Sequence, residues 1–293
     1  MDEKTALHTA ARRFCEEQHS HWATQYMELE QTANSRGSRP FSADWKYSDE
    51  SYRLFPRYRL DEAILVELER LTPATLGAPR TAVVEAGQRA LSRLTFEFKE
   101  KPVARLALEN EFAAYRSFIE SQSTSELDAV SPLPYRRVLK PEESESTWTL
   151  LKGRWGVEGR GVYWYPIGTA DPPLGVIAFH QELWDTRNGH ELLLRFLRQN
   201  VIDRCFLLQE IEAVDYEIDV NLIKSRYMGD EAFLTSDGDW LLYISHESSL
   251  TLAGSLATFF QNEWTDFERL SYGGPFHTND LRGTWKFPDA KNA

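Results

Sequence analysis

The sequence predicts an α+β fold in which an N-terminal helical bundle is followed by a mixed or antiparallel sheet with flanking helices. Apolar side chains recur at helical spacing through most of residues 1–122. Short apolar or aromatic runs bounded by glycine, proline and aspartate follow in residues 147–293, as is typical of strands. Strand-like and helical patterns do not alternate regularly in this second part, so an all-parallel sheet is not expected.

Four helices are expected in the first part. The first covers residues 5–34 and ends in a cluster of breaker residues. Residues 41–58 are aromatic and irregular, and we expect them to form a loop anchored on the helices. The remaining helices are expected over residues 61–71, 80–98 and 103–119. Short turns that carry proline and glycine join these segments, as in a helical bundle.

Residues 123–146 are expected to form a linker or a crossing segment. They are rich in serine, proline and glutamate, and such a composition buries little apolar surface. The helical domain is therefore placed at residues 1–122 and the sheet domain at residues 147–293.

A hairpin is expected in the sheet domain. Residues 233–234 and 240–244 flank the turn-forming residues 236–239. The other expected elements are a helix near 146–155, strands at 162–167 and 175–179, a helix over 189–200, a long strand over 205–220 broken near Ala213, a strand at 250–252 and a helix over 256–270.

The cysteines and the apolar runs indicate a cytoplasmic protein. Cys15 and Cys205 lie far apart and show no zinc-binding spacing, so buried free thiols in a reducing compartment are expected. The N-terminus shows no signal-peptide pattern, and no apolar run approaches the roughly 18 residues that a membrane span needs. Contact with a membrane is therefore not expected.

The charge distribution favours a basic protein partner. The formal net charge is −12; residues 1–146 carry 20 basic and 24 acidic side chains, and residues 147–293 carry 13 and 21. The two parts therefore have net charges of −4 and −8. A field of this sign repels phosphate backbones, so nucleic-acid binding is not expected.

Asp215, Glu217 and Asp219 alternate with apolar residues along one expected strand. Alternate strand residues face the same side, so these carboxylates would form an acidic row, which Glu210 and Glu212 extend. Carboxylates at roughly 7 Å spacing can hold a hard cation such as Mg²⁺ or Ca²⁺, and a divalent cation is the one cofactor that the sequence suggests. The other interpretation is the polar face of a half-exposed strand, which discourages edge pairing.

Seven of the nine tryptophans lie after residue 146. Most are expected to fill the core, while one or two beside the acidic row would make a binding hot spot, with Trp240 as the candidate.

Ser245, His246 and Glu247 directly follow the apolar run 240–244 and are the catalytic candidates. These residue types perform nucleophilic and acid–base catalysis. Consecutive strand residues point to opposite faces, so the three cannot form a triad among themselves, and His246 would act alone or with a distant partner. The alternative is a polar turn whose hydroxyls hydrogen-bond the backbone.

Three functions are consistent with these patterns. The leading hypothesis is an intracellular binding protein of immunity or regulatory type, whose acidic, aromatic-bearing C-terminal face engages a basic protein partner. The alternative is a divalent-metal-dependent hydrolase or nuclease-like enzyme that uses the acidic row and His246. A third is a scaffold that docks through the aromatic residues 41–58. The sequence leaves the oligomeric state open.

Overall fold

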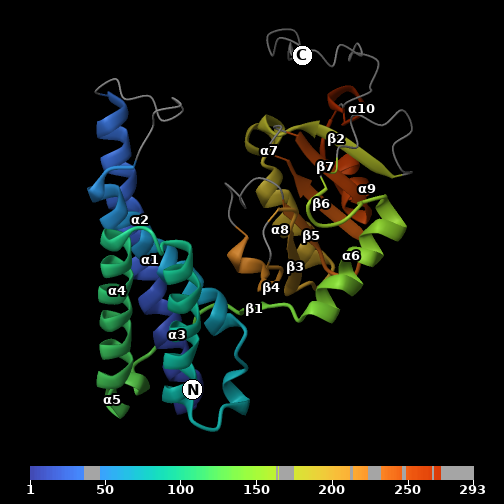
Figure 1. The fold of residues 1–293 in the computed structure, drawn as a ribbon. Helices are drawn as coiled ribbons and strands as arrows, with labels where there is room; N and C mark the ends of the chain where they lie inside the picture. The colour runs from blue at the N-terminus through green and yellow to red at the C-terminus, as the bar shows by residue number, and fades with distance from the viewer. Residues whose placement is uncertain are drawn as a thin grey trace. The chain divides into compact units, whose positions relative to one another are not determined.

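A computed structural model of the protein describes residues 1–35, 47–162, 164, 175–211, 214–223, 232–245, 249–265 and 267–271. The chain divides into two compact units, Met1–Leu133 and Pro134–Ala293. The first unit is helical and the second is built on an antiparallel sheet (Figure 1), which confirms the predicted α+β class.

The helical unit consists of long helices that pack side by side. Its elements are α1 (Glu3–Ser35), α2 (Asp49–Glu69), a 3-10 turn (Pro73–Thr75), α3 (Pro79–Glu97), α4 (Pro102–Ser121) and the short α5 (Thr124–Asp128). Proline stands at the start of both α3 and α4, where its missing N–H costs nothing because the first helical donors have no partner within the helix.

The start of α2 differs from the sequence prediction. The helix begins at Asp49, so residues 49–58, expected to be a loop, are helical. Ser48 caps it by accepting a hydrogen bond from the Ser51 amide at 3.0 Å, and acidic residues occupy the first turn. Pro56 removes one backbone donor inside the helix, and the buried face that includes Leu60 and Ile64 offsets this loss.

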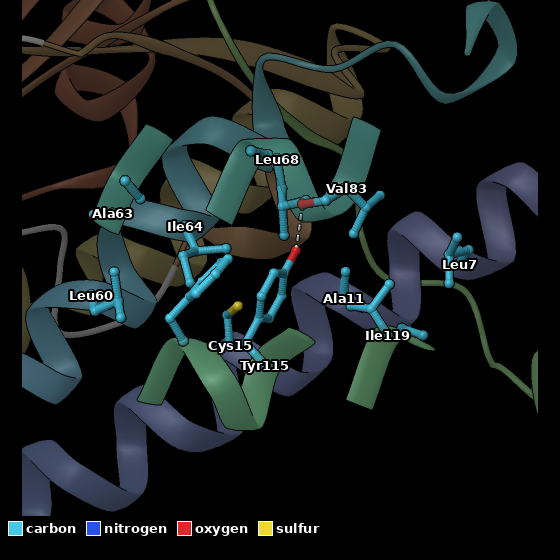
Figure 2. Close-up of a cluster of buried hydrophobic side chains, with 14 of the residues drawn as sticks. Leu7, Ala11, Cys15, Leu60, Ala63, Ile64, Leu68, Val83, Tyr115 and Ile119 are labelled. Atoms are coloured by element: carbon cyan, nitrogen blue, oxygen red, sulfur yellow. Dashed lines mark hydrogen bonds between the residues drawn. The ribbon is translucent and has the colours of Figure 1, made fainter. Parts of the chain in front are cut away.

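Figure 2 shows the core of the helical unit around Tyr115 of α4, which is fully buried. Its hydroxyl donates a hydrogen bond to the carbonyl oxygen of Val83 in α3 at 2.9 Å. Gly87, one turn further along α3, allows this close approach, because a Cβ there would lie 2.7 Å from the Tyr115 ring. These contacts fix α3 against α4.

The segment 123–146 contains regular structure on both sides of the division between the units. Ser123 and Glu126 form a capping box at the start of α5, and Leu127 is buried in the core of the helical unit. The second unit begins with the strand β1 (Arg136–Val138) and the helix α6 (Pro141–Trp155).

Within the described residues, the sheet of the second unit has seven strands in the order β1-β4-β3-β5-β6-β7-β2, and every neighbouring pair is antiparallel. Its other strands are β2 (Val176–His180), β3 (Arg204–Gln209), β4 (Tyr216–Asp219), β5 (Ala232–Thr235), β6 (Trp240–Ile244) and β7 (Ser249–Gly254). The predicted hairpin is confirmed as β5–β6, and the long strand expected over 205–220 is the antiparallel pair β3 and β4. The strand expected at 162–167 lies mostly outside the described residues.

The strands β5, β6 and β7 are buried on both faces of the sheet. Leu241 and Tyr243 of β6 point to one face, which packs against Trp148 of α6 and is called the α6 face below. The neighbouring Trp240 points to the opposite face, where its ring lies 5.8 Å from that of Phe196 in α8. The described helices of this unit beyond α6 are α7 (Glu182–Thr186), α8 (Gly189–Gln199), α9 (Ser255–Glu263) and α10 (Phe267–Leu270). None of the helices in the described ranges is long and apolar enough to cross a lipid bilayer.

Candidate functional site

The structure places the first member of the predicted acidic row, Asp215, inside the protein. Asp215 lies just before β4 and is 2% exposed, so its expected position on a solvent-facing row is wrong. Its Oδ2 accepts hydrogen bonds from Ser144 Oγ at 2.5 Å and from Trp148 Nε1 at 2.9 Å, both in α6. Arg160 donates to the same oxygen, and the backbone amide of Gln209 donates to Oδ1 at 3.0 Å. Asp215 therefore joins α6 to the α6 face of the sheet.

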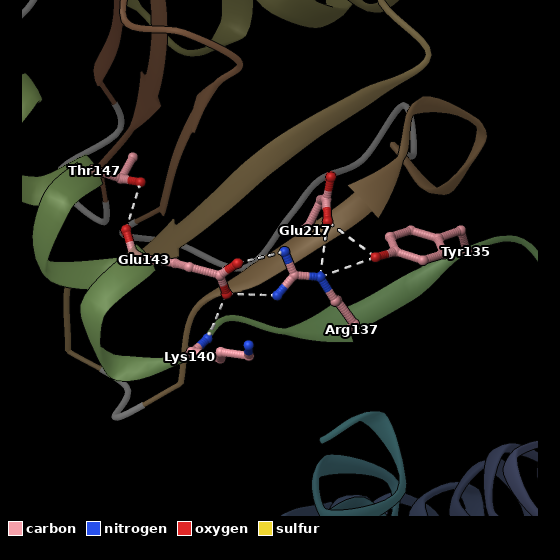
Figure 3. Close-up of polar contacts among 6 residues, drawn as sticks. All are labelled: Tyr135, Arg137, Lys140, Glu143, Thr147 and Glu217. Carbon is pink, nitrogen blue, oxygen red and sulfur yellow. Dashed lines mark hydrogen bonds and ion pairs between the residues drawn. The ribbon is translucent and has the colours of Figure 1, made fainter. Parts of the chain in front are cut away.

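Glu217, the second member, is half-buried in an ion-pair network with β1 and α6 (Figure 3). Its Oε2 accepts hydrogen bonds from Arg137 Nε at 2.9 Å and from the Tyr135 hydroxyl at 3.0 Å. The guanidinium of Arg137 also binds both carboxylate oxygens of Glu143, at 2.6 and 3.0 Å. Hydrogen bonds from this guanidinium lower the pKa of Glu143, and the same pairing raises the pKa of Arg137. The network holds the edge strand β1 in place.

Asp219, the third member, caps the 3-10 turn that follows β4. Its Oδ1 accepts hydrogen bonds from the backbone amide and the side-chain amide of Asn221, at 2.8 and 2.7 Å. The side chain is half-buried and serves the local backbone.

The described residues give no support to a metal site on this row. Each of the three carboxylates makes its own protein contacts, and no group of three or more His, Cys, Asp or Glu residues within the described ranges is arranged to hold a metal ion. Trp240, expected at the binding face, is 1% exposed and donates from Nε1 to Ser236 Oγ at 2.8 Å. Asp215 and Trp240, two of the residues predicted to form an acidic, aromatic-bearing surface, are therefore buried.

Ser245 is the one catalytic candidate that the structure describes; His246 and Glu247 lie outside the described residues. Ser245 follows β6 and is 2% exposed. Its backbone amide donates a hydrogen bond to the carbonyl oxygen of Ser249 at 2.9 Å. Ser249 is in turn paired with His180 across β7 and β2. The register therefore aligns three polar side chains on the α6 face.

Among the described residues, no hydrogen bond joins Ser249 to the ring of His180. The Oγ of Ser249 is buried and has no hydrogen-bond partner among the residues that the structure describes. His180 Nδ1 accepts a hydrogen bond from the Glu182 amide at 3.2 Å, so in the neutral ring the proton lies on Nε2, which then donates and cannot act as a base. Burial lowers the pKa of His180, which favours this neutral form.

Glu210, expected to extend the exposed acidic row, is fully buried at the end of β3. Its Oε2 accepts a hydrogen bond from the Tyr243 hydroxyl at 2.9 Å, and its Oε1 accepts one from the Trp164 amide at 2.6 Å. The sequence signal that could have identified it is its position two residues after the apolar run 205–208. Glu210 ties the backbone at Trp164 to the α6 face; Glu212 lies outside the described residues.

A cluster of five aromatic rings lies at the surface of the helical unit. We call it the aromatic cluster; its members are Tyr26 of α1, Tyr47, and Tyr52, Phe55 and Tyr58 of α2. Phe55 lies at its centre, with centroids 5.5 Å from Tyr26, 6.1 Å from Tyr47 and 5.3 Å from Tyr58. Tyr47 is 45% exposed and the other four are partly exposed. Burial of the ring raises the pKa of Tyr58 to about 12, so its hydroxyl is neutral at physiological pH.

No protein-family model matches the chain, and no curated protein and no solved structure matches it either. Function is therefore inferred from the residues themselves.

Proposed function

We propose that the chain is an intracellular binding protein, of immunity or regulatory type, that engages a basic protein partner through the aromatic cluster. The observation that carries this proposal is the partial exposure of five packed aromatic rings on α1, on α2 and at Tyr47, two residues before α2. Aromatic side chains, and tyrosine above all, are enriched at binding hot spots, where an apolar ring and a polar hydroxyl both find partners.

The packing of the cluster favours tight association. Each ring is held by a neighbour, as in the pair Tyr47 and Tyr52 with centroids 5.8 Å apart, and α2 holds three of the rings on one helix. Side chains that are ordered before binding lose little conformational entropy when a partner covers them. The cluster therefore offers a contact surface at low entropic cost.

The charge and the ring chemistry favour a basic partner. The net charge of −12 attracts cationic proteins over long range and accelerates their encounter. Aromatic faces also bind cations directly, and Lys101 Nζ already lies 4.8 Å from the centroid of the Tyr52 ring. Exposed acidic residues, Asp49 and Glu50, stand in the first turn of α2 beside the cluster. Arginine and lysine side chains of a partner would find both rings and carboxylates here.

The test is capture of partners from the native host by the wild-type chain and by two variants. The first variant, Tyr47→Ser with Tyr52→Ser, removes two rings that are not fully buried. The matched control is Phe96→Ser, which removes a ring that is 72% exposed on α3 and outside the cluster. The proposal expects a salt-sensitive, basic protein with wild type and Phe96→Ser, and its loss with the double variant. Equal recovery by all three chains, or recovery of no such protein, contradicts the proposal.

A further inference from the structure

The helical unit buries a carboxyl group that receives no hydrogen bond from any residue in its described ranges. Asp61 of α2 is 0% exposed, and neither of its oxygens has a hydrogen-bond partner in the structure. A buried polar atom without a partner is rare in folded proteins, and an ionised carboxylate in that position loses its hydration without compensation. The neutral acid costs far less to bury.

The charged neighbours of Asp61 do not compensate for its burial. Glu111 of α4 is 2% exposed and adds a second carboxylate close by. Arg57, one turn earlier on α2, is the nearby cation, but its Nη1 donates to Glu111 Oε2 at 3.3 Å. The guanidinium carbon of Arg57 also lies 4.4 Å from the centroid of the Trp22 ring. Arg57 is thus engaged with Glu111 and Trp22.

Of the ionisable groups that α1 presents to α2, Arg12 pairs with Glu69 at 3.2 Å, His19 contacts the ring of Tyr58, and Cys15 lies in the core beside Asp61. Cys15 of α1 is fully buried, and burial raises the pKa of its thiol well above the usual value, so the thiol is neutral. Val83 and Ala86 of α3 are buried in the same core (Figure 2 shows Cys15 and Val83). Burial, with Glu111 adding to it and Arg57 opposing it, raises the pKa of Asp61 to about 9.

We infer that Asp61 keeps its proton in the folded helical unit, and that loss of this proton loosens the packing of α2 against α1 and α4. The folded state binds a proton that the unfolded chain releases above its ordinary pKa of 3.8. The stabilising effect is therefore complete below about pH 4 and is lost progressively as the pH rises towards the folded value of about 9. Asp61 is a pH-sensitive element built into the bundle.

This inference stands apart from the proposed partner binding, although the two regions share α2. Tyr58 of the aromatic cluster precedes Asp61 by three residues, so the two lie on neighbouring positions of one helix. Loosening α2 would disturb the cluster, but the protonation of Asp61 is measured without any partner.

The test compares wild type with Asp61→Asn in the full chain between pH 5 and pH 8. Asparagine keeps the shape of the protonated acid and cannot ionise. Urea unfolding followed by hydrogen exchange of α2 and α4 peptides gives an unfolding constant for the helical unit. The ratio of this constant in wild type to that in Asp61→Asn is expected to rise about tenfold per pH unit, because one proton is released on unfolding.

The matched control is Glu62→Gln, the adjacent carboxyl on the same helix, which is 50% exposed and bound to Arg59 at 3.0 Å. Its unfolding constant is expected to follow that of wild type across the pH range. A ratio for Asp61→Asn that stays constant with pH overturns the inference.

Carbon-13 NMR of the aspartate carboxyl groups gives a second, independent readout. The signal that is missing in Asp61→Asn is expected at the position of a protonated acid at pH 7. A carboxylate position at pH 7 overturns the inference, whatever the unfolding data show.

Discussion

Replacing Asp215 by alanine tests whether this carboxylate is structural. The substitution removes the acceptor of hydrogen bonds from Ser144, Trp148, Arg160 and the Gln209 amide. The Trp148 indole N–H and the Gln209 amide would remain in the interior without this partner, and each such donor costs about 1–3 kcal/mol. Arg160, whose side chain is 35% exposed, can turn to water. We expect Asp215→Ala to lower the free energy of unfolding by about 3–5 kcal/mol.

The assay is urea unfolding of the full chain, followed by tryptophan fluorescence, with Asp219→Ala as the matched control. Among the described residues, the Asp219 side chain accepts hydrogen bonds only from Asn221, in the turn that follows β4. Loss of such a cap costs about 1 kcal/mol. The reasoning is refuted if Asp215→Ala unfolds within about 1 kcal/mol of wild type, or if Asp219→Ala costs more than Asp215→Ala.

Three further predictions follow from the sheet unit. Gly254→Ala places a Cβ 2.1 Å from the Asp239 carbonyl oxygen at a backbone φ of 63°, and should lower the free energy of unfolding by about 3 kcal/mol or more. The control Gly153→Ala, with open space around its Cβ, should raise the free energy of unfolding by up to about 1 kcal/mol. Tyr243→Phe removes a hydrogen bond to the buried carboxylate of Glu210 and should cost about 1–3 kcal/mol, and an unchanged urea midpoint would contradict this. Millimolar Mg²⁺ or Mn²⁺ should leave the melting temperature unchanged, whereas a saturable rise would restore the metal hypothesis.

The fold class could be predicted because its signals are local. The hairpin β5–β6 follows from turn residues between two apolar runs, and proline marks the starts of α3 and α4. The start of α2 was missed because Pro56 and the surrounding aromatic residues indicate a loop locally. The apolar face of the helix, completed by packing, outweighs that local preference.

The roles of the acidic residues could not be predicted, because they depend on contacts far along the chain. Alternation along the strand predicted that Asp215 and Glu217 share a face, and the contacts observed are Asp215 with Ser144 and Trp148 of α6, and Glu217 with Arg137 of β1. The pattern does not reveal that α6 covers this face, and the Ser144 contact to Asp215 spans 71 residues. The buried Glu210 likewise depends on Tyr243, which is 33 residues away.

The most direct test of the proposed function is the affinity of the recovered basic partner for wild type and for Tyr52→Ala, measured by calorimetry at low and moderate salt. We predict that wild-type affinity falls as salt rises and that Tyr52→Ala weakens binding by about tenfold or more, as for a hot-spot residue. Equal affinity of the two chains, with no dependence on salt, would contradict binding of a basic partner at the aromatic cluster.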